Sequence, residues 1–411
     1  MKTVSDRDVT EPTAEASELN EHLVSALEQA GRITDPEIAA AFRATPRHLF
    51  LPHIELSEAY KDDYQPTDRD GAGRLLSSVS APWLVAQMLE YLRPRPGNSV
   101  LEIGSGGYNA ALLRRLVGDA GAVTSIDIDP AVTERARRCL RAAGLESAVR
   151  VLTGDGAHGA ADAAPYDRIE VTVQAAAIEQ TWLDQLAPDG VLVVPLRVRG
   201  LGRLVALAPE GAGHWTGGGW LPCGFVAMRG EAASSTRTHA LNPGVRVRVD
   251  GTRPLDPDAL AKVLDSAGSA RWSGVEVGAG EGTRPLVDLW LATVLDTFGT
   301  LLTDPQKSAL RTLPGGTPIT WNADSGAAAY VTMRPAQGRR ERYEYGVVLH
   351  GEDHALAEAT VENLREWDRD HRGRPGPVLH VYSEGTDRAA MAPGRALERP
   401  GAPMVLTWPK P

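Results

Sequence analysis

Cysteine is scarce in this sequence, and long apolar runs are absent. Only two of its 411 residues are cysteines, Cys139 and Cys223, and neither has a histidine nearby at metal-ligand spacing. This excludes a disulfide framework, predicts no metal site, and fits a reducing compartment such as the cytoplasm. No apolar stretch approaches the roughly 20 residues that cross a bilayer, and the first residues lack the apolar core of a signal peptide. We therefore expect a protein that is neither exported nor embedded in a membrane.

Long clusters of positive charge are absent as well. The net charge is -10, and lysine and arginine gather only in short pairs. Because a surface that follows phosphates needs clustered basic residues, nucleic acid is not expected as a partner. The hydrophobic share of 42% is sufficient for buried cores, and a chain of 411 residues is expected to divide into two domains.

The first half of the chain predicts an α/β domain. Residues 1–18 are polar and acidic and predict disorder, residues 20–30 and 35–43 predict helices, and residues 60–76 predict a loop. The strands predicted after residue 99 are 100–103, 123–128, 149–154, 166–173 and 190–196, and the helices between them are 109–117, 131–143 and 178–186. Such repeated βα units indicate a mainly parallel, doubly wound sheet that binds ligands at the carboxyl ends of its strands.

The second half predicts a separate α+β domain with antiparallel pairing. The polar segment 229–238 indicates the boundary. Beyond it the predicted strands are 246–251, 272–278, 318–324, 328–334, 342–351, 377–384 and 403–410, and the predicted helices are 256–265, 286–298 and 354–369. The expected division is a disordered segment 1–18, a domain at 19–230 and a domain at 239–411. The stretch HGEDH at 350–354 predicts a loop with a helix N-cap, since it lacks the spacing of a helical zinc motif.

The stretch VLEIGSGGYNA at 100–110 leads from a strand through a glycine turn into a helix. A dinucleotide fingerprint requires a third glycine where Asn109 stands, and no Gly-Lys-Ser or Gly-Lys-Thr follows as in a P-loop. Acidic residues accompany three successive strands: Glu102 in the first, Asp127 at the end of the second and Asp155 after the third. S-adenosyl-L-methionine suits such a rim, because it has no phosphates, carries cationic groups and offers hydroxyl and amino donors.

The cofactor site expected from this pattern uses one acid per strand. The glycines let the backbone approach the methionine end, Asp127 is placed to accept from the ribose diol, and Asp155 from the adenine N6. A structural turn for the glycines and helix caps for the two aspartates are the alternatives. The residues predicted to bind the cofactor are Glu102, Gly104, Ser105, Gly106, Gly107, Asn109, Asp127, Ile128, Gly154, Asp155 and Gly156.

Seven segments in the first half carry a resemblance to a known family. They are PRHLF at 46–50, EAYKDD at 58–63, VSAPWLVAQMLEYL at 79–92, VLEIGSGGYNAALL at 100–113, GDG at 154–156, APYDRIEV at 164–171 and QLAPDGVLVVPL at 185–196. In this order they resemble the protein-L-isoaspartate O-methyltransferases, which implies a Rossmann-like class I methyltransferase domain over about residues 20–230. The chain departs from the family in its glycine turn, one residue shorter than G-x-G-x-G-Y, and in Gln174 where the family usually has glycine.

The resemblance implies that the Ser-x-Pro element lies over the transferred methyl group. Ser80 would contact the substrate carboxyl, with Ser78 beside it in the catalytic set. A carboxylate is already an anion at pH 7, so alignment and exclusion of water are needed rather than a strong base. The residues implied to bind substrate are Tyr60, Asp62, Val79, Ala81, Pro82 and Trp83.

Plainer interpretations of the same residues are open. Ser80 before a proline also reads as a helix N-cap, and Asp62 as a loop residue. Trp83 and His48 read as packing residues.

The large second half suggests a dedicated substrate. Longer relatives with a C-terminal extension are similar to methyltransferases that tailor ribosomally made peptides such as lanthipeptides, lasso peptides and graspetides. The favoured hypothesis is therefore esterification of an aspartyl side chain in a cyclised precursor peptide, followed by succinimide (aspartimide) formation and hydrolysis to isoaspartate, with S-adenosyl-L-homocysteine as co-product. The alternatives are repair of L-isoaspartyl residues in damaged proteins and a non-catalytic peptide-binding scaffold. The oligomeric state is left open, and a monomer is compatible with the sequence.

Overall fold

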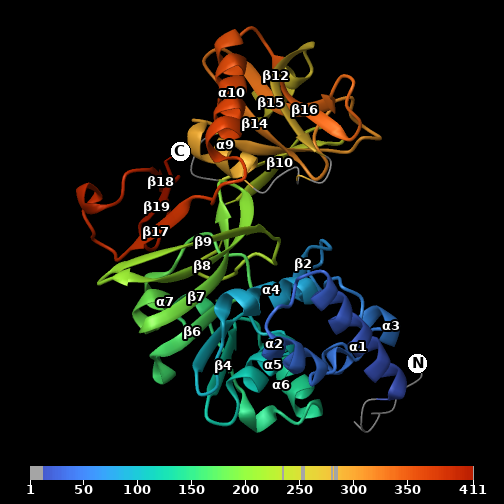
Figure 1. The fold of residues 1–411 in the computed structure, drawn as a ribbon, viewed down its shortest axis with the longest axis vertical. Helices are drawn as coiled ribbons and strands as arrows, with labels where there is room; N and C mark the ends of the chain where they lie inside the picture. Colours follow the sequence, from blue (N-terminus) through green and yellow to red (C-terminus); the bar gives the residue numbers. More distant parts are fainter. Residues whose placement is uncertain (1–12, 234–235, 251–254, 279–280, 282–285, 411) are drawn as a thin grey trace.

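The computed structural model describes residues 13–233, 236–250, 255–278, 281 and 286–410. Within these ranges the strands form a ten-stranded mixed sheet, a seven-stranded antiparallel sheet and a two-stranded hairpin (Figure 1). No helix in the described ranges is long and apolar enough to cross a membrane.

In the described residues, the first helices close one side of the ten-stranded sheet. Helix α1 (Ala14–Gln29) starts after the N-cap Thr13, and α2 (Pro36–Arg43) starts after Asp35, whose side chain accepts the Glu37 amide. Residues 14–18 are therefore helical, contrary to the prediction of disorder, because the capped helix extends one turn beyond its apolar stripe. The rest of that prediction, residues 1–12, lies outside the described residues.

Part of the ten-stranded sheet is parallel, as the alternating pattern predicts, and its strand order is β7–β6–β3–β4–β5. Its strands are β3 (Ser99–Ile103), β4 (Ala122–Asp127), β5 (Arg150–Thr153), β6 (Tyr166–Val171) and β7 (Leu186–Val198). The chain order reverses beside β3, with β4 on one side and β6 on the other. In such sheets this switch point is where ligands bind.

Helices cover both faces of this sheet, because successive strand side chains point to opposite sides. Val100 packs into the cluster that includes α1 and α2, whereas the neighbouring Leu101 packs into the cluster on the other face. The further helices are α4 (Pro82–Leu92), α5 (Tyr108–Val117) and α6 (Pro130–Ala142) on the first face and α7 (Gln180–Gln185) on the second.

The same sheet continues with antiparallel strands from two distant parts of the chain. β8 (Leu201–Gly211) pairs with β7, and β9 (His214–Pro222) pairs with β8. The chain end then returns to β9 with the strands β17 (Val378–Tyr382), β19 (Met404–Thr407) and β18 (Arg395–Leu397). Figure 1 shows these red strands beside the green sheet. The predicted unit 239–411 therefore does not form one sheet, because its last strands complete the first.

The second sheet is antiparallel throughout, as predicted. Its order is β10–β11–β13–β14–β15–β16–β12. The strands are β10 (Arg237–Asn242), β11 (Val245–Val249), β12 (Gly268–Gly278), β13 (Gly299–Thr303), β14 (Thr317–Asn322), β15 (Ala327–Pro335) and β16 (Arg342–His350). The helices are α8 (Pro257–Leu264), α9 (Val287–Val294) and α10 (His354–Glu366). β10 begins inside the segment predicted to be the domain boundary.

A hairpin replaces most of the predicted loop at 60–76. It follows the short helix α3 (Leu56–Ala59) and consists of β1 (Gln65–Arg69) and β2 (Leu75–Val79), which pair antiparallel. Its turn is held by Asp70, whose Oδ1 accepts the Ala72 and Arg74 amides. The strand QPTDR has no apolar alternation, so periodicity did not reveal it.

Candidate active site

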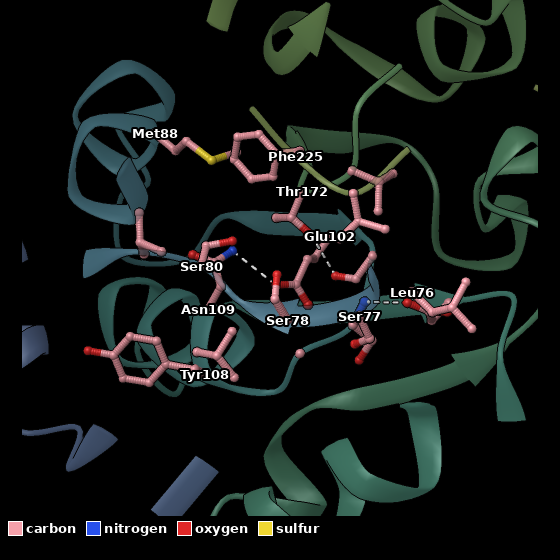
Figure 2. A pocket seen from close by; sticks show the side chains of 18 residues that line it. Leu76, Ser77, Ser78, Ser80, Met88, Glu102, Tyr108, Asn109, Thr172 and Phe225 are labelled. Carbon is pink, nitrogen blue, oxygen red and sulfur yellow. Dashed lines mark hydrogen bonds between the residues drawn. The ribbon is translucent and has the colours of Figure 1, made fainter. Parts of the chain in front are cut away.

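A pocket opens at the switch point of the ten-stranded sheet. It encloses about 630 Å³ of space, part of it open to solvent. The hairpin strand β2, the turn after β3 and the segment after β9 form its walls (Figure 2). Its lining residues are Leu76, Ser77, Ser78, Val79, Ser80, Val85, Met88, Glu102, Gly104, Ser105, Gly106, Tyr108, Asn109, Asp127, Thr172, Val173, Phe225 and Val226.

The three glycines of the turn differ in their backbone conformation and in their surroundings. Gly104 has φ +100°, and a Cβ there would lie 2.5 Å from the Thr172 hydroxyl oxygen. Gly107 has φ +83° and is the N-cap of α5, so both are required by the turn itself. Gly106 differs, because the only neighbour of a Cβ there would be the carbonyl oxygen of Ser78, at 3.8 Å. Of the three, Gly106 leaves the most room for a ligand against the backbone.

Asp127 links the glycine turn to the rim of the pocket. Its Oδ2 accepts the Ser105 amide at 3.0 Å, and its Oδ1 accepts the Asp129 amide at 2.9 Å. A carboxylate offers about four lone-pair sites, so each oxygen keeps capacity for a ligand hydroxyl. Asp129 is the N-cap of α6, which relieves Asp127 of the capping role that was its alternative interpretation.

A second hollow continues the pocket beyond Asp127. It shares Leu76, Gly104, Asp127, Val173 and Val226 with the first pocket. Its further lining residues include Ile128, Gly156, Met228 and Arg229. The Arg229 guanidinium lies 3.1 Å from Asp129 and 3.8 Å from Asp127. The two hollows together form one groove along the strand ends.

Asp155 does not line this groove. Its Oδ1 accepts the Ala157 amide at 2.9 Å, and its Oδ2 accepts the Glu231 amide at 2.9 Å. The carboxylate thus caps a short helical turn and fastens the chain after Arg229, which agrees with the capping alternative. Gly154 also lies outside both sets of lining residues. Contact of Asp155 with an adenine amino group stays a prediction.

Two buried acids meet beneath the glycine turn. Glu102 on β3 pairs in register with Glu170 on β6, and neither is exposed to solvent. The Asn109 side-chain amide donates to both, at 2.9 Å to Glu102 and 2.8 Å to Glu170 (Figure 2 draws the first). The Ser125 hydroxyl also donates to Glu102, while Glu170 Oε1 has no partner in the described structure.

Burial shifts both acids toward their neutral forms. It raises the pKa of Glu102 to about 7 despite the hydrogen bonds from Ser125 and Asn109. It raises the pKa of Glu170 to about 8, and repulsion from Glu102 adds to this rise. Two carboxylates that share one amide donor cannot both ionise cheaply, so at neutral pH the pair holds at least one proton. Glu102 and Asn109 are residues that the sequence predicts for the site, whereas the position of Glu170 in its strand gives no such signal.

Ser78, Val79 and Ser80 line the pocket, whereas the other residues implied to bind substrate are not among its lining residues. The N-cap position of α4 is Ala81, without a side-chain cap, so the N-cap interpretation of Ser80 is wrong. Pro82 is the first residue of the helix, and Asp62 Oδ1 accepts the Trp83 amide at 2.8 Å. Asp62 therefore supplies the missing cap from a distant segment.

Tyr60, His48 and Trp83 pack around this helix start. The Tyr60 hydroxyl is 2.8 Å from His48 Nδ1, which confirms a hydrogen-bonded packing role for the histidine. Trp83 packs against the core, and the Arg32 guanidinium lies 5.3 Å from its ring centroid.

Replacing Asp62 with alanine is expected to lower the midpoint of thermal unfolding by about 2 °C. Loss of an N-cap costs about 1 kcal/mol, and that energy shifts the midpoint of a domain of about 200 residues by this amount. Asp63→Ala is the matched control, since the neighbouring side chain accepts only the amide of Tyr64. Equal midpoints for the two variants in a calorimetric scan would contradict the capping role.

Several residues that complete the groove were not predicted. Phe225, Val226 and Arg229 follow β9, far along the chain from the glycine turn, and only the fold brings them there. Met88 and Phe225 point toward one another (Figure 2). The Thr172 hydroxyl donates to the Gly104 carbonyl at 2.8 Å and fixes the turn.

The part of the chain that the structure describes holds no group of three or more metal-ligating side chains. At HGEDH, Asp353 accepts the Leu356 amide as the N-cap of α10, as predicted. The His350 Nδ1 faces the Ser266 carbonyl at 2.9 Å, so this histidine is a packing residue.

Comparison with known proteins identifies similar sequences and similar solved structures. Residues 17–232 match the family model described as protein-L-isoaspartate(D-aspartate) O-methyltransferase. The protein-L-isoaspartate O-methyltransferase of Methanopyrus kandleri is 37% identical over 212 residues, which cover 51% of this chain and 91% of that protein. The enzyme of the same name from Methanoregula boonei is 43% identical over 188 residues, which cover 45% of this chain and 82% of that protein.

A solved structure named protein-L-isoaspartate O-methyltransferase extends the likeness beyond these ranges. It has a TM-score of 0.50 and 24% sequence identity, and it covers 88% of this chain and 96% of that chain. At this identity the likeness concerns the fold alone. The fold of the second half therefore has a counterpart in a solved structure of that name.

Proposed function

We propose that this chain, which belongs to the protein-L-isoaspartate(D-aspartate) O-methyltransferase family, methylates the free carboxylate of L-isoaspartyl residues in damaged proteins. The observation that carries the proposal is the family match over residues 17–232, a range that includes every residue of the groove. The family is one of carboxyl methyltransferases, and its cofactor is S-adenosyl-L-methionine.

The groove fits this cofactor chemically. The carboxylate of Asp127 keeps lone pairs for the ribose hydroxyls, and Gly106 leaves the backbone accessible beside it. Asn109 lines the pocket, and its buried Oδ1, which has no partner in the described structure, is an acceptor available to an ammonium group. Ile128, Gly156 and Met228 offer a weakly polar hollow for a base. When bound, the cofactor supplies a methyl group activated by the sulfonium.

The chain's own residues then position the carboxylate and keep water away. Ser80 and Ser78 donate hydroxyl hydrogen bonds that hold one carboxylate oxygen toward the methyl group. The carboxylate needs no base, because it is ionised at neutral pH. Met88 and Phe225 close one side of the pocket with apolar surface. The rate enhancement therefore comes from alignment and desolvation.

Substituting Ser80 with alanine is expected to lower kcat about tenfold and to change KM for an isoaspartyl peptide little. Such a split identifies an interaction that aligns the bound carboxylate rather than one that binds the peptide. Ser57→Ala, an exposed position in α3, serves as the control. An unchanged kcat for Ser80→Ala, measured by methyl ester formation, would remove this residue from the catalytic set.

The alternative substrate is an aspartyl side chain of a cyclised precursor peptide, with aspartimide as the product. Its main support was the large second half of the chain. The solved structure that covers 88% of this chain has the name of the family, so length alone does not favour a dedicated peptide. Repair of isoaspartyl residues fits the relatives better.

Mass spectrometry of methylated peptides separates the two substrates. We expect short peptides with one L-isoaspartate to be esterified with little sequence preference, and their aspartyl counterparts to stay unmodified. Methylation of aspartyl peptides alone would reject the repair proposal in favour of tailoring. A protein that binds S-adenosyl-L-homocysteine but modifies neither would reject both.

A further inference from the structure

A second large cavity lies where the two sheets meet. It encloses about 780 Å³ and is lined from both sides, by β8 and the end of β9 from the first sheet and by β11, β13 and α9 from the second half. We call it the junction cavity. The residues that matter for its chemistry are Arg203, Arg248, Asp288 and Thr300.

Two buried polar groups of this cavity have no partner in the described structure. Arg203 is 3% exposed; its Nη2 donates to Asp288 at 2.5 Å and its Nη1 to the Gly202 carbonyl at 2.9 Å, but its Nε donates to nothing. Thr300 is 7% exposed, and its hydroxyl also lacks a partner. A buried donor without an acceptor costs about 1–3 kcal/mol, so both groups indicate an occupant that accepts hydrogen bonds.

Arg248 gives the junction cavity a net positive charge. Asp288 neutralises Arg203, and the nearby Asp250 pairs with Arg399. The half-buried guanidinium of Arg248 forms no hydrogen bond or ion pair with the described residues. Burial lowers its pKa, and the neighbouring Arg246 contributes to this, so the local field is unfavourable to a lone cation. The half-buried Arg197 adds repulsion to the same region.

A bound anion compensates the positive charge of Arg248. It also accepts hydrogen bonds from the two donors that have no partner in the described structure. Arginine presents a planar fork of N–H groups that matches carboxylate and phosphate oxygens. We propose that the junction cavity binds a carboxylate or phosphate group through Arg248, with the Arg203 Nε and the Thr300 hydroxyl as further donors. The proposal stands apart from methyl transfer, since none of these residues lines the groove.

The cavity and the groove nevertheless share a wall. Pro222 and Cys223 line the junction cavity, while Phe225 and Val226 line the methyl-transfer pocket. Two sources of the anion follow from this position: a free anion such as phosphate, or an acidic side chain of a polypeptide held at the groove.

Calorimetric titration of the full chain tests the proposal with three probes. These are inorganic phosphate, a peptide with blocked termini and one glutamate, and the same peptide with glutamine. We expect phosphate or the glutamyl peptide to bind the unmodified protein. Arg248→Gln should weaken that binding at least tenfold, while Arg246→Gln, which removes only a neighbouring charge, should weaken it much less. Arg246 is the matched control because it is an exposed arginine on the same strand.

The pattern of binding identifies the source of the anion. Binding of phosphate alone assigns the cavity to a free anion, and binding of the glutamyl peptide over its glutaminyl counterpart assigns it to a polypeptide. Retained affinity for S-adenosyl-L-homocysteine in Arg248→Gln shows that the fold is intact. Thr300→Val, which replaces the side chain with one of nearly equal size, should weaken binding of the same probe. No binding of any probe at millimolar concentration, or equal binding by Arg248→Gln, would overturn the proposal.

Discussion

Replacing Asp127 with alanine is expected to weaken binding of S-adenosyl-L-homocysteine by about 100-fold. In the proposed function this carboxylate accepts hydrogen bonds from both ribose hydroxyls, and bonds to a charged group contribute about 1.5–3 kcal/mol each. Its loss also frees the Ser105 and Asp129 amides that hold the turn. Each 1.4 kcal/mol corresponds to about tenfold in affinity, so two lost bonds account for the effect. Isothermal calorimetry with the purified chain measures it directly.

Asp129→Asn is the matched control for this experiment. It removes a charge two residues away, while asparagine preserves the N-cap of α6. We expect its affinity to lie within a few-fold of the unmodified protein. Equal affinities of the Asp127 and Asp129 variants would contradict the ribose contact. If the unmodified chain binds no S-adenosyl-L-homocysteine at all, the hypothesis of a non-catalytic scaffold replaces the proposed enzymatic function.

Changing Glu170 to glutamine is expected to raise the free energy of unfolding by about 2 kcal/mol at pH 7. The folded protein raises the pKa of this carboxyl from its usual 4.5 to about 8, so the buried acid must stay protonated at a pH where the unfolded chain ionises it freely. Above pH 4.5 this cost grows by about 1.4 kcal/mol for each rise of one in pH. Glutamine keeps an acceptor for Asn109 without that cost, although its buried amide donor offsets about 1 kcal/mol of the gain. Urea unfolding of the two proteins measures the difference.

The raised pKa of Glu170 determines how the free energy of unfolding changes with pH. Below the unfolded pKa of 4.5 both states are protonated, and the contribution of Glu170 to stability is fully present. As pH rises toward 8, the unfolded state loses its proton first, so stability is lost progressively over this window. The gap between Glu170→Gln and the unmodified protein should therefore widen from pH 4.5 to pH 8. A gap that is constant with pH, or matched by the exposed control Glu18→Gln, would show that Glu170 is ionised in the folded state.

The groove shows which parts of a site a sequence can reveal. The glycine turn, Asp127 and the strands around them were predicted because strand periodicity and positive-φ glycines are local features. Glu102 and Asn109 were found for the same reason, since both stand within a few residues of the turn. Asp155 was also recognised as a possible cap, and its carboxylate does cap the turn that follows it. Its second contact, to the Glu231 amide, was not predictable.

Other features could not be predicted from the sequence, because they depend on residues far away along the chain. Glu170 lies in β6, where charged and apolar residues are mixed, and only the register of β6 against β3 brings it beside Glu102. Asp62 was interpreted as a loop or substrate residue, whereas it caps α4 across a gap of 21 positions. Strand β1 of the hairpin (QPTDR) is polar, so no apolar alternation revealed its pairing with β2.

The sequence by itself determined that the first half is a doubly wound sheet with an acidic rim and that the second half pairs antiparallel. Those properties follow from the spacing of apolar residues and glycines, which acts over a few residues at a time. Tertiary structure alone decided that the chain end completes the first sheet, that residues after β9 close the groove, and that two acids share one amide in its floor. The physical reason is that pairing between distant strands and the burial of charge depend on neighbours that no local pattern specifies.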